Sequence, residues 1–169
     1  MLKDPDIRSL LDERTIRHIL ARYCRGLDRM DKDMAYSSWH PDATAVYDGL
    51  FEGSGHDFID WAWKTHAELD RHFHQINNTV IELSGDRATS EAYVTVVVWT
   101  KPDEKGDQVE IITRGRYLDR WDRRMGVWAI NHRTYLTDMQ TIHPLAPGSV
   151  SSRSTRDQHD PSFDFIPRG

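Results

Sequence analysis

Two histidines stand two residues apart in the segment RHFHQINN, residues 71–78. Alternate residues of a strand share a face, so His72 and His74 are expected on the same side as Asn78. An imidazole has an unperturbed pKa of about 6.5 and can take or give a proton near neutral pH. This face is therefore expected either to meet water or to line a pocket in which protons are transferred.

His74 is the candidate general base, and Asp28 is the carboxylate expected to support it. Asp28 follows Leu20 by eight residues and Cys24 by four, at the edge of the apolar stripe of an amphipathic helix. A carboxylate bound to an imidazole fixes its tautomer and stabilises the charge that it acquires. The competing interpretation is that His74 is a structural or surface residue and that Asp28 only ends its helix.

Four other side chains are candidate ligand contacts. His72 is nearer the start of its strand and is expected at the rim, and Asn78 would orient a ligand or satisfy buried backbone. Tyr23 lies on the apolar stripe of the first helix, and Tyr47 faces inward if its strand neighbours Ala43 and Ala45 do. Both tyrosines are equally compatible with an ordinary core.

Arg133 lies in the strand-like run GVWAINHRTYLTDM, where alternation places it on the face of Ala129 and Asn131. Inside a pocket its guanidinium would be a strong hydrogen-bond donor to an oxyanion or a leaving group. Spacing alone favours a solvated arginine.

Other chemistries have weaker support. The pair of histidines in RHFHQINN would need a distant third ligand, such as His132 or Asp28, to hold a metal, so no metal site is predicted. The single cysteine, Cys24, lies on an apolar stripe and is expected in the core. One cysteine permits neither an intrachain disulfide nor a cysteine zinc cluster.

Length and composition indicate one globular, soluble domain. The chain has 169 residues, of which 38% are hydrophobic and 29% charged. A net charge of −5 argues against nucleic acid as the main partner, because phosphate binding needs clustered basic residues. The N-terminal stretch lacks the apolar run of a signal peptide, and nothing resembles a membrane span, so a cytoplasmic location is expected.

The expected fold class is α+β, with helices packed on one face of a curved sheet. Helices are predicted over residues 13–28, 32–40 and 55–70, and strands over 43–51, 72–83, 87–100, 108–124 and 126–139. The last four strands are joined by turn sequences and should be antiparallel neighbours. We expect a folded domain over residues 1–143 and an extended tail over 144–169, whose apolar end would cover a pocket or a neighbouring subunit.

The segments YCRGLDRMD, WHPDATAVYDGLFEGSG, HFHQINNTVIEL and RGRYLDRWDRRMGVWAINHRTYL carry a family resemblance. Over roughly residues 8–148 the chain resembles the SnoaL-like branch of the nuclear-transport-factor-2-like superfamily. This resemblance implies a cone-shaped α+β barrel, a strongly curved mixed or antiparallel sheet wrapped by N-terminal helices around a pocket. Within the superfamily the chain is most similar to the hexachlorocyclohexane dehydrochlorinases and, more distantly, the scytalone dehydratases.

Both groups are lyases that use a His–Asp dyad without a cofactor, so the resemblance implies that His74 and Asp28 form the dyad. It also implies that Arg133 belongs to the site. One position departs from the dehydrochlorinase pattern, because Tyr23 stands where those enzymes have a lysine. A phenol near the dyad is instead similar to the scytalone dehydratases and to lyases of phenolic diaryl compounds.

The leading hypothesis is a cofactor-independent lyase that removes water, formaldehyde or hydrogen halide from a small hydrophobic, phenolic or diaryl substrate. Tyr23 and Arg133 would bind its oxygens or leaving group, and the apolar wall would be formed by Tyr47, Trp39, Val96 and Val98. The alternatives are an isomerase or cyclase with the same dyad, and a non-catalytic ligand-binding or dioxygenase small-subunit-like protein. A homo-oligomer, dimer or trimer, is expected, because the outer sheet face carries Phe73, Val97 and Trp99.

Overall fold

The computed structural model describes residues 4–145 and 152–166. Within these residues the elements follow one another as α1 (Asp4–Asp28), α2 (Lys32–Tyr36), β1 (Trp39–Tyr47), β2 (Phe51–Ser54), α3 (Gly55–Ala67), β3 (Leu69–Ser84), β4 (Arg87–Thr100), β5 (Val109–Arg124), β6 (Val127–Pro144) and the 3₁₀ turn η1 (Pro161–Asp164).

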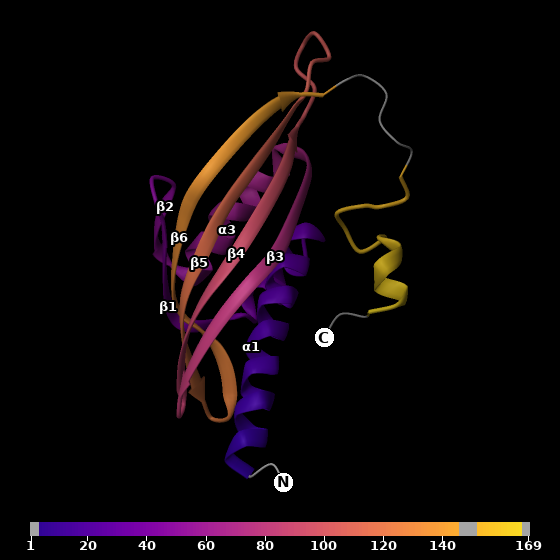
Figure 1. The fold of residues 1–169 in the computed structure, drawn as a ribbon. Coiled ribbons are helices and arrows are strands. Elements are labelled where there is room, and N and C mark those ends of the chain that lie inside the picture. The colour runs from indigo at the N-terminus through magenta and orange to yellow at the C-terminus, as the bar shows by residue number, and fades with distance from the viewer. Residues whose placement is uncertain (1–3, 146–151, 167–169) are drawn as a thin grey trace.

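The strands form one mixed sheet in the order β2-β1-β6-β5-β4-β3. Strands β3 to β6 are antiparallel neighbours, as predicted, and β1 runs parallel to β6. The sheet is long and curved, and α1 and α3 lie on its concave side (Figure 1). The α+β class is therefore confirmed, although the sheet is open, with β2 and β3 at its two edges, and does not close into a barrel.

Helix α1 presents a continuous apolar stripe to the sheet. At most 5% of the surface is exposed for each of its core residues Ile16, Leu20, Tyr23, Cys24 and Leu27, whose spacing of three and four follows the helical period. A Cβ on Gly26 would lie 2.8 Å from the backbone nitrogen of Ala35, so glycine lets α2 pack directly against the last turn of α1. This packing fixes the end of α1, where Asp28 lies.

The second helix is shorter than predicted. Helix α2 ends at Tyr36, where the Ser37 hydroxyl donates to the Met34 carbonyl. Trp39, expected in this helix, instead begins β1 and pairs with Ile130 of β6. The prediction failed because a neighbouring strand supplies backbone hydrogen bonds that outweigh the local helical pattern.

Strand β3 contains a bulge that changes which residues face the core. Ile76 pairs with Val94, whereas Thr79 pairs with Ala92, so two residues of β3 oppose one of β4. Before the bulge even-numbered residues point inward, and after it odd-numbered residues do. Asn78 is consequently exposed, and the expectation that it shares the face of His72 and His74 is wrong.

The C-terminal residues 152–166 lie on the side of the molecule on which α1 lies (Figure 1). Residues 152–166 contact Arg25, in the last turn of α1, and Arg29, which directly follows α1. Their outermost apolar residues, Phe165 and Ile166, are exposed.

None of the helices in the described ranges is long and apolar enough to span a membrane.

Candidate active site

His74 and Asp28 meet in the interior, where β3 passes the end of α1. His74 Nδ1 lies 2.7 Å from Asp28 Oδ1, and the His74 backbone N–H donates to both carboxylate oxygens at 3.1 Å. The two residues are 8% and 6% exposed. The carboxylate is therefore held by the main chain of the same residue whose ring it contacts, which fixes both the distance and the direction of the contact.

This geometry specifies the proton positions on His74. A carboxylate only accepts hydrogen bonds, so the Nδ1 atom of His74 carries the proton that is donated to Asp28. In a neutral imidazole the other nitrogen, Nε2, then keeps its lone pair. The arrangement is that of a general base oriented by an acid.

His74 borders a cavity of about 180 Å³ that opens to the surface beside Leu50, which is 57% exposed. Aromatic rings dominate its wall, and a stacked contact between Tyr47 and Phe58, with centroids 3.7 Å apart, forms part of it. The lining comprises Tyr23, Leu27, Tyr47, Leu50, Phe58, Trp61, Ala62, His66, His74, Val96, Thr113, Tyr117, Tyr135, Thr137 and Gln140. The site thus combines one oriented base with a mostly apolar hollow.

Two tyrosine hydroxyls supply hydrogen-bond donors to this cavity. Tyr23 Oη and Tyr47 Oη are 3.1 Å apart. Burial raises the pKa of Tyr47 to about 12 although the Arg133 guanidinium lowers it, and burial raises the pKa of Tyr23 well above its usual value. Both hydroxyls therefore stay protonated at neutral pH. One proton bridges the pair, which leaves the other O–H to donate to a ligand oxygen.

Arg133 is buried behind the tyrosines and does not border the cavity itself. It is 0% exposed and forms a bidentate ion pair with Asp119, at 2.6 Å from Nε and 2.8 Å from Nη2. Its Cζ lies 3.8 Å from the Tyr117 ring centroid and 4.5 Å from that of Tyr23. Nη1 has no hydrogen-bond partner among the described residues. The expectation from spacing that Arg133 is exposed to solvent is therefore wrong. Arg133 can act on a ligand only through its neighbours.

The structure adds His66 of α3 to the candidate site. Its ring centroid lies 4.4 Å from that of His72 and 5.7 Å from that of His74, and the residue borders the cavity. Burial, together with the nearby His72, lowers the pKa of His66 to about 2. The sequence contains a signal for it, because Phe58, Ala62 and His66 follow the helical spacing of four. Asp119 was not predicted from the sequence either, although two-residue spacing along its strand places it on the same face as Tyr117 and Trp121.

Several predicted ligand contacts lie outside the cavity lining. His72 is buried and not at a rim; its Nε2 is 2.8 Å from the Leu27 carbonyl oxygen. Trp39 lies behind the wall, with its ring centroid 6.1 Å from that of Tyr23. Val96 borders the cavity, as predicted, whereas Val98 pairs with His72 and does not.

Metal-binding geometry is not found at these residues. Within residues 4–145 and 152–166, no three His, Cys, Asp or Glu side chains are arranged to hold a metal ion. His132, considered as a third ligand, instead hydrogen-bonds through Nδ1 to the Thr44 hydroxyl at 2.7 Å.

Comparisons with solved structures identify the fold. Hexachlorocyclohexane dehydrochlorinase LinA of type 2 matches with a TM-score of 0.73 and 19% identity, over 87% of this chain and 97% of that one. LinA-type3 from Novosphingobium barchaimii LL02 matches with a TM-score of 0.72 and 19% identity, over 87% of this chain and 99% of that one. A scytalone dehydratase-like protein from Novosphingobium aromaticivorans DSM 12444 matches with a TM-score of 0.70 and 20% identity, over 79% of this chain and 88% of that one. At such identities the likeness establishes a shared fold.

Sequence comparison identifies the family. A comparison with curated proteins found no match. The model of the SnoaL-like domain matches residues 8–134, which is most of the chain. This stretch runs from α1 into β6 and includes His74, Asp28 and Arg133. The chain therefore belongs to the SnoaL-like domain family, within the nuclear-transport-factor-2-like superfamily.

Proposed function

We propose that this protein is a cofactor-independent lyase that eliminates water, formaldehyde or a hydrogen halide from a small aromatic substrate. The observation that carries the proposal is the buried contact of His74 with Asp28 beside an aromatic-lined cavity. A purely ligand-binding protein has no need to bury a carboxylate and an imidazole next to open space, because burying such groups costs free energy. The shared fold with a dehydrochlorinase lends further support.

For an elimination of H–X, each group has a defined role. His74 Nε2 takes the proton from the substrate carbon, and the electrons of that C–H bond form the new double bond. The C–X bond breaks, its electron pair leaves with X, and a tyrosine O–H donates to the departing atom. Asp28 stabilises the imidazolium that forms. Arg133 is a positioning residue that polarises the hydroxyls of Tyr23 and Tyr47.

Cavity size and lining restrict the substrate class. An apolar cavity of about 150 Å³ is enough to hold benzene, so about 180 Å³ accommodates one substituted aromatic ring. A diaryl substrate would have to leave its second ring outside or displace part of the wall. Phenol hydroxyls donate well to oxygen, and Tyr23 stands where the resemblance predicts a lysine in dehydrochlorinases. We therefore favour an oxygen leaving group over chloride.

A turnover screen tests the proposal. Single-ring and diaryl phenolic alcohols are incubated with the protein, with a chelator present and no cofactor added, and products are followed by mass spectrometry. Loss of water or formaldehyde identifies a lyase, whereas a product of unchanged mass identifies an isomerase or cyclase. His74→Ala should reduce kcat by about a hundredfold or more, the typical contribution of a general base. Full activity in both His74→Ala and Asp28→Asn would exclude the mechanism.

A further inference from the structure

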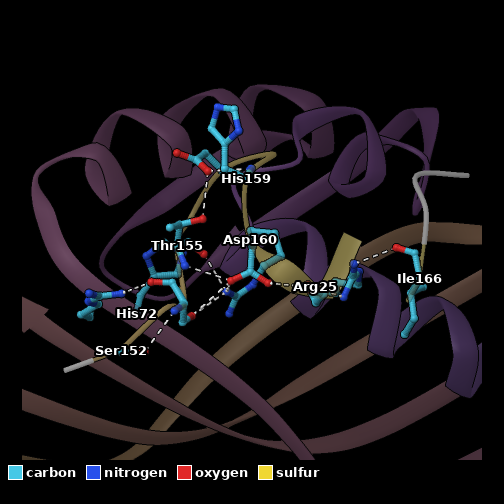
Figure 2. A network of polar contacts seen from close by, with 12 residues as sticks. Arg25, His72, Ser152, Thr155, His159, Asp160 and Ile166 are labelled. Atoms are coloured by element: carbon cyan, nitrogen blue, oxygen red, sulfur yellow. Dashed lines mark hydrogen bonds and ion pairs between the residues drawn. The ribbon is translucent and has the colours of Figure 1, made fainter. Parts of the chain in front are cut away.

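The segment 152–166, here called the strap, is anchored to the end of α1 by two arginines. Arg29 forms an ion pair of 2.8 Å with Asp160, and Arg25 donates to the Ile166 carbonyl oxygen at 3.0 Å. Figure 2 shows Thr155, Asp160 and Ile166 of the strap together with Arg25 of α1 and His72 of β3. The strap therefore lies against the same turn of α1 that carries Asp28.

Arg156 of the strap reaches the joint between α3 and β3. Its Nη1 atom donates to the His66 carbonyl oxygen at 2.8 Å and contacts His72 Nδ1 at 2.9 Å. Its Nη2 atom donates to the Leu69 carbonyl oxygen at 2.7 Å. One guanidinium thus joins the strap to the helix and the strand that supply His66, His72 and His74.

The contact with Arg156 determines the tautomer of His72. A guanidinium only donates hydrogen bonds, so His72 Nδ1 must be the unprotonated acceptor. His72 Nε2 lies 2.8 Å from the Leu27 carbonyl oxygen, which only accepts, so Nε2 must carry the proton. Two independent neighbours require the same neutral form, and a doubly protonated His72 would break the contact with Arg156.

Resting on the proposed function, we propose that Arg156 is a positioning residue of the lyase site, which fixes the His72 tautomer that holds the last turn of α1 and, with it, Asp28. Leu27 directly precedes Asp28, and His72 and His74 are successive inward residues of β3. The two imidazoles therefore hydrogen-bond to two adjacent residues of α1. His72 contacts the Leu27 carbonyl oxygen, and His74 contacts the Asp28 carboxylate.

The charges around His72 support this arrangement. His74 and Asp28 face it from β3 and α1, His66 faces it from α3, and Arg156 faces it from the strap. Burial lowers the pKa of His72 to about 4, with contributions in the same direction from His74 and Arg156. His66 also stays neutral.

Imidazole nitrogen NMR of the free, full-length protein tests the placement of the His72 proton without any substrate. The wild type should show a neutral His72 with protonated Nε2 and unprotonated Nδ1 near neutral pH. Arg156→Met, which keeps an unbranched stem but cannot donate, should raise the His72 titration midpoint by about one pH unit or more. A cationic or Nδ1-protonated His72 in the wild type would overturn the inference, as would unchanged nitrogen shifts in Arg156→Met.

Kinetics separate positioning from simple anchoring of the strap. Arg156→Met should lower kcat by about tenfold to a hundredfold with little change in KM, because it displaces the dyad and not the substrate. Arg156→Lys keeps one charged donor to His72 and should restore most of the lost kcat. Arg153→Gln is the matched control, since Arg153 lies in the strap but makes no recorded contact with His66, His72 or His74.

The two proposals fail in different ways. Equal kcat in the wild type and Arg156→Met, in an enzyme that His74→Ala inactivates, would refute the role of Arg156 and leave the lyase intact. Equal loss of kcat in Arg156→Met and Arg156→Lys would also refute it, because it would indicate only a bulk packing effect.

Discussion

Asp119 and Arg133 face each other across β5 and β6 and form a bidentate ion pair whose side chains are both 0% exposed. Removing one partner of a buried ion pair leaves an uncompensated charge in the interior. Asp119→Ala should therefore lower the free energy of unfolding by about 3–5 kcal/mol, measured by urea denaturation.

The double variant Asp119→Leu/Arg133→Met is the control for this prediction. It removes both charges at similar volume and should recover most of the lost stability, because apolar replacements of buried ion pairs are often neutral. The double variant should still lose catalytic rate, since Tyr23 and Tyr47 no longer have a cation beside them. An Asp119→Ala protein as stable as the wild type would show that the pair is solvated in solution.

The second prediction concerns the paired hydroxyls of Tyr23 and Tyr47. Tyr23→Phe and Tyr47→Phe should each lower kcat/KM by about tenfold, the equivalent of one neutral hydrogen bond. The double variant should lose less than the product of the two, because the hydroxyls act as one hydrogen-bonded unit. Tyr36→Phe is the control, because Tyr36 does not border the cavity and its hydroxyl donates to Asp60. A loss in Tyr36→Phe equal to that in Tyr23→Phe would contradict a specific role for the pair.

Regular periodicity made His74 and Asp28 candidates for the central contact, and the family resemblance was needed to predict that they pair. The three-and-four spacing of α1 places Leu27 in the core and Asp28 beside it, and alternation in β3 turns His74 inward. Neither inference depends on the order of the strands in the sheet. The contact of 2.7 Å between the two side chains then follows from packing α1 on the sheet.

Features that depend on strand register were not predictable from spacing. The bulge between Ile76 and Thr79 exists only relative to β4, and it reverses the face of Asn78. Arg133 is buried because Asp119 lies directly opposite it on β5, fourteen residues earlier in the chain. Local sequence does not encode this pairing.

Acid should destabilise the protein through His72. Burial lowers the pKa of His72 to about 4, below the 6.5 of an unperturbed imidazole. Between these values the unfolded chain binds the proton and the folded protein does not, so stability is full above about pH 6.5 and falls as the pH drops towards 4. From about pH 7.5 to about pH 5 this group alone should lower the free energy of unfolding by about 2 kcal/mol.

Urea denaturation across this pH range measures the effect. His72→Gln removes the titrating group while keeping an amide that can donate to the Leu27 carbonyl, and its stability should depend less on pH. If the free energy of unfolding of His72→Gln depends on pH as steeply as that of the wild type, the acid sensitivity comes from another group.

The outer face of β3 makes the last prediction, which concerns assembly. Phe73 lies between His72 and His74 on the opposite face and is 52% exposed. Its neighbours across the sheet are Val97 of β4 and Ile112 of β5, so an apolar row crosses three strands. Apolar patches of this kind often mark interfaces, and we propose that this row joins two or three copies of the chain.

Phe73→Glu should therefore shift the protein from a homo-oligomer towards the monomer, measured by light scattering after size-exclusion chromatography. Val80→Glu is the matched control, because Val80 is an exposed apolar residue of the same strand, 59% exposed, but its partner across the sheet is the charged Glu91. Trp99, whose indole N–H donates to Glu110 at 2.8 Å, is partly buried within the subunit and should contribute less. A monomeric wild type, or equal masses for Phe73→Glu and the wild type, would contradict this interface. Because Phe73 is flanked in sequence by His72 and His74, loss of the interface should also loosen the strand that carries the base.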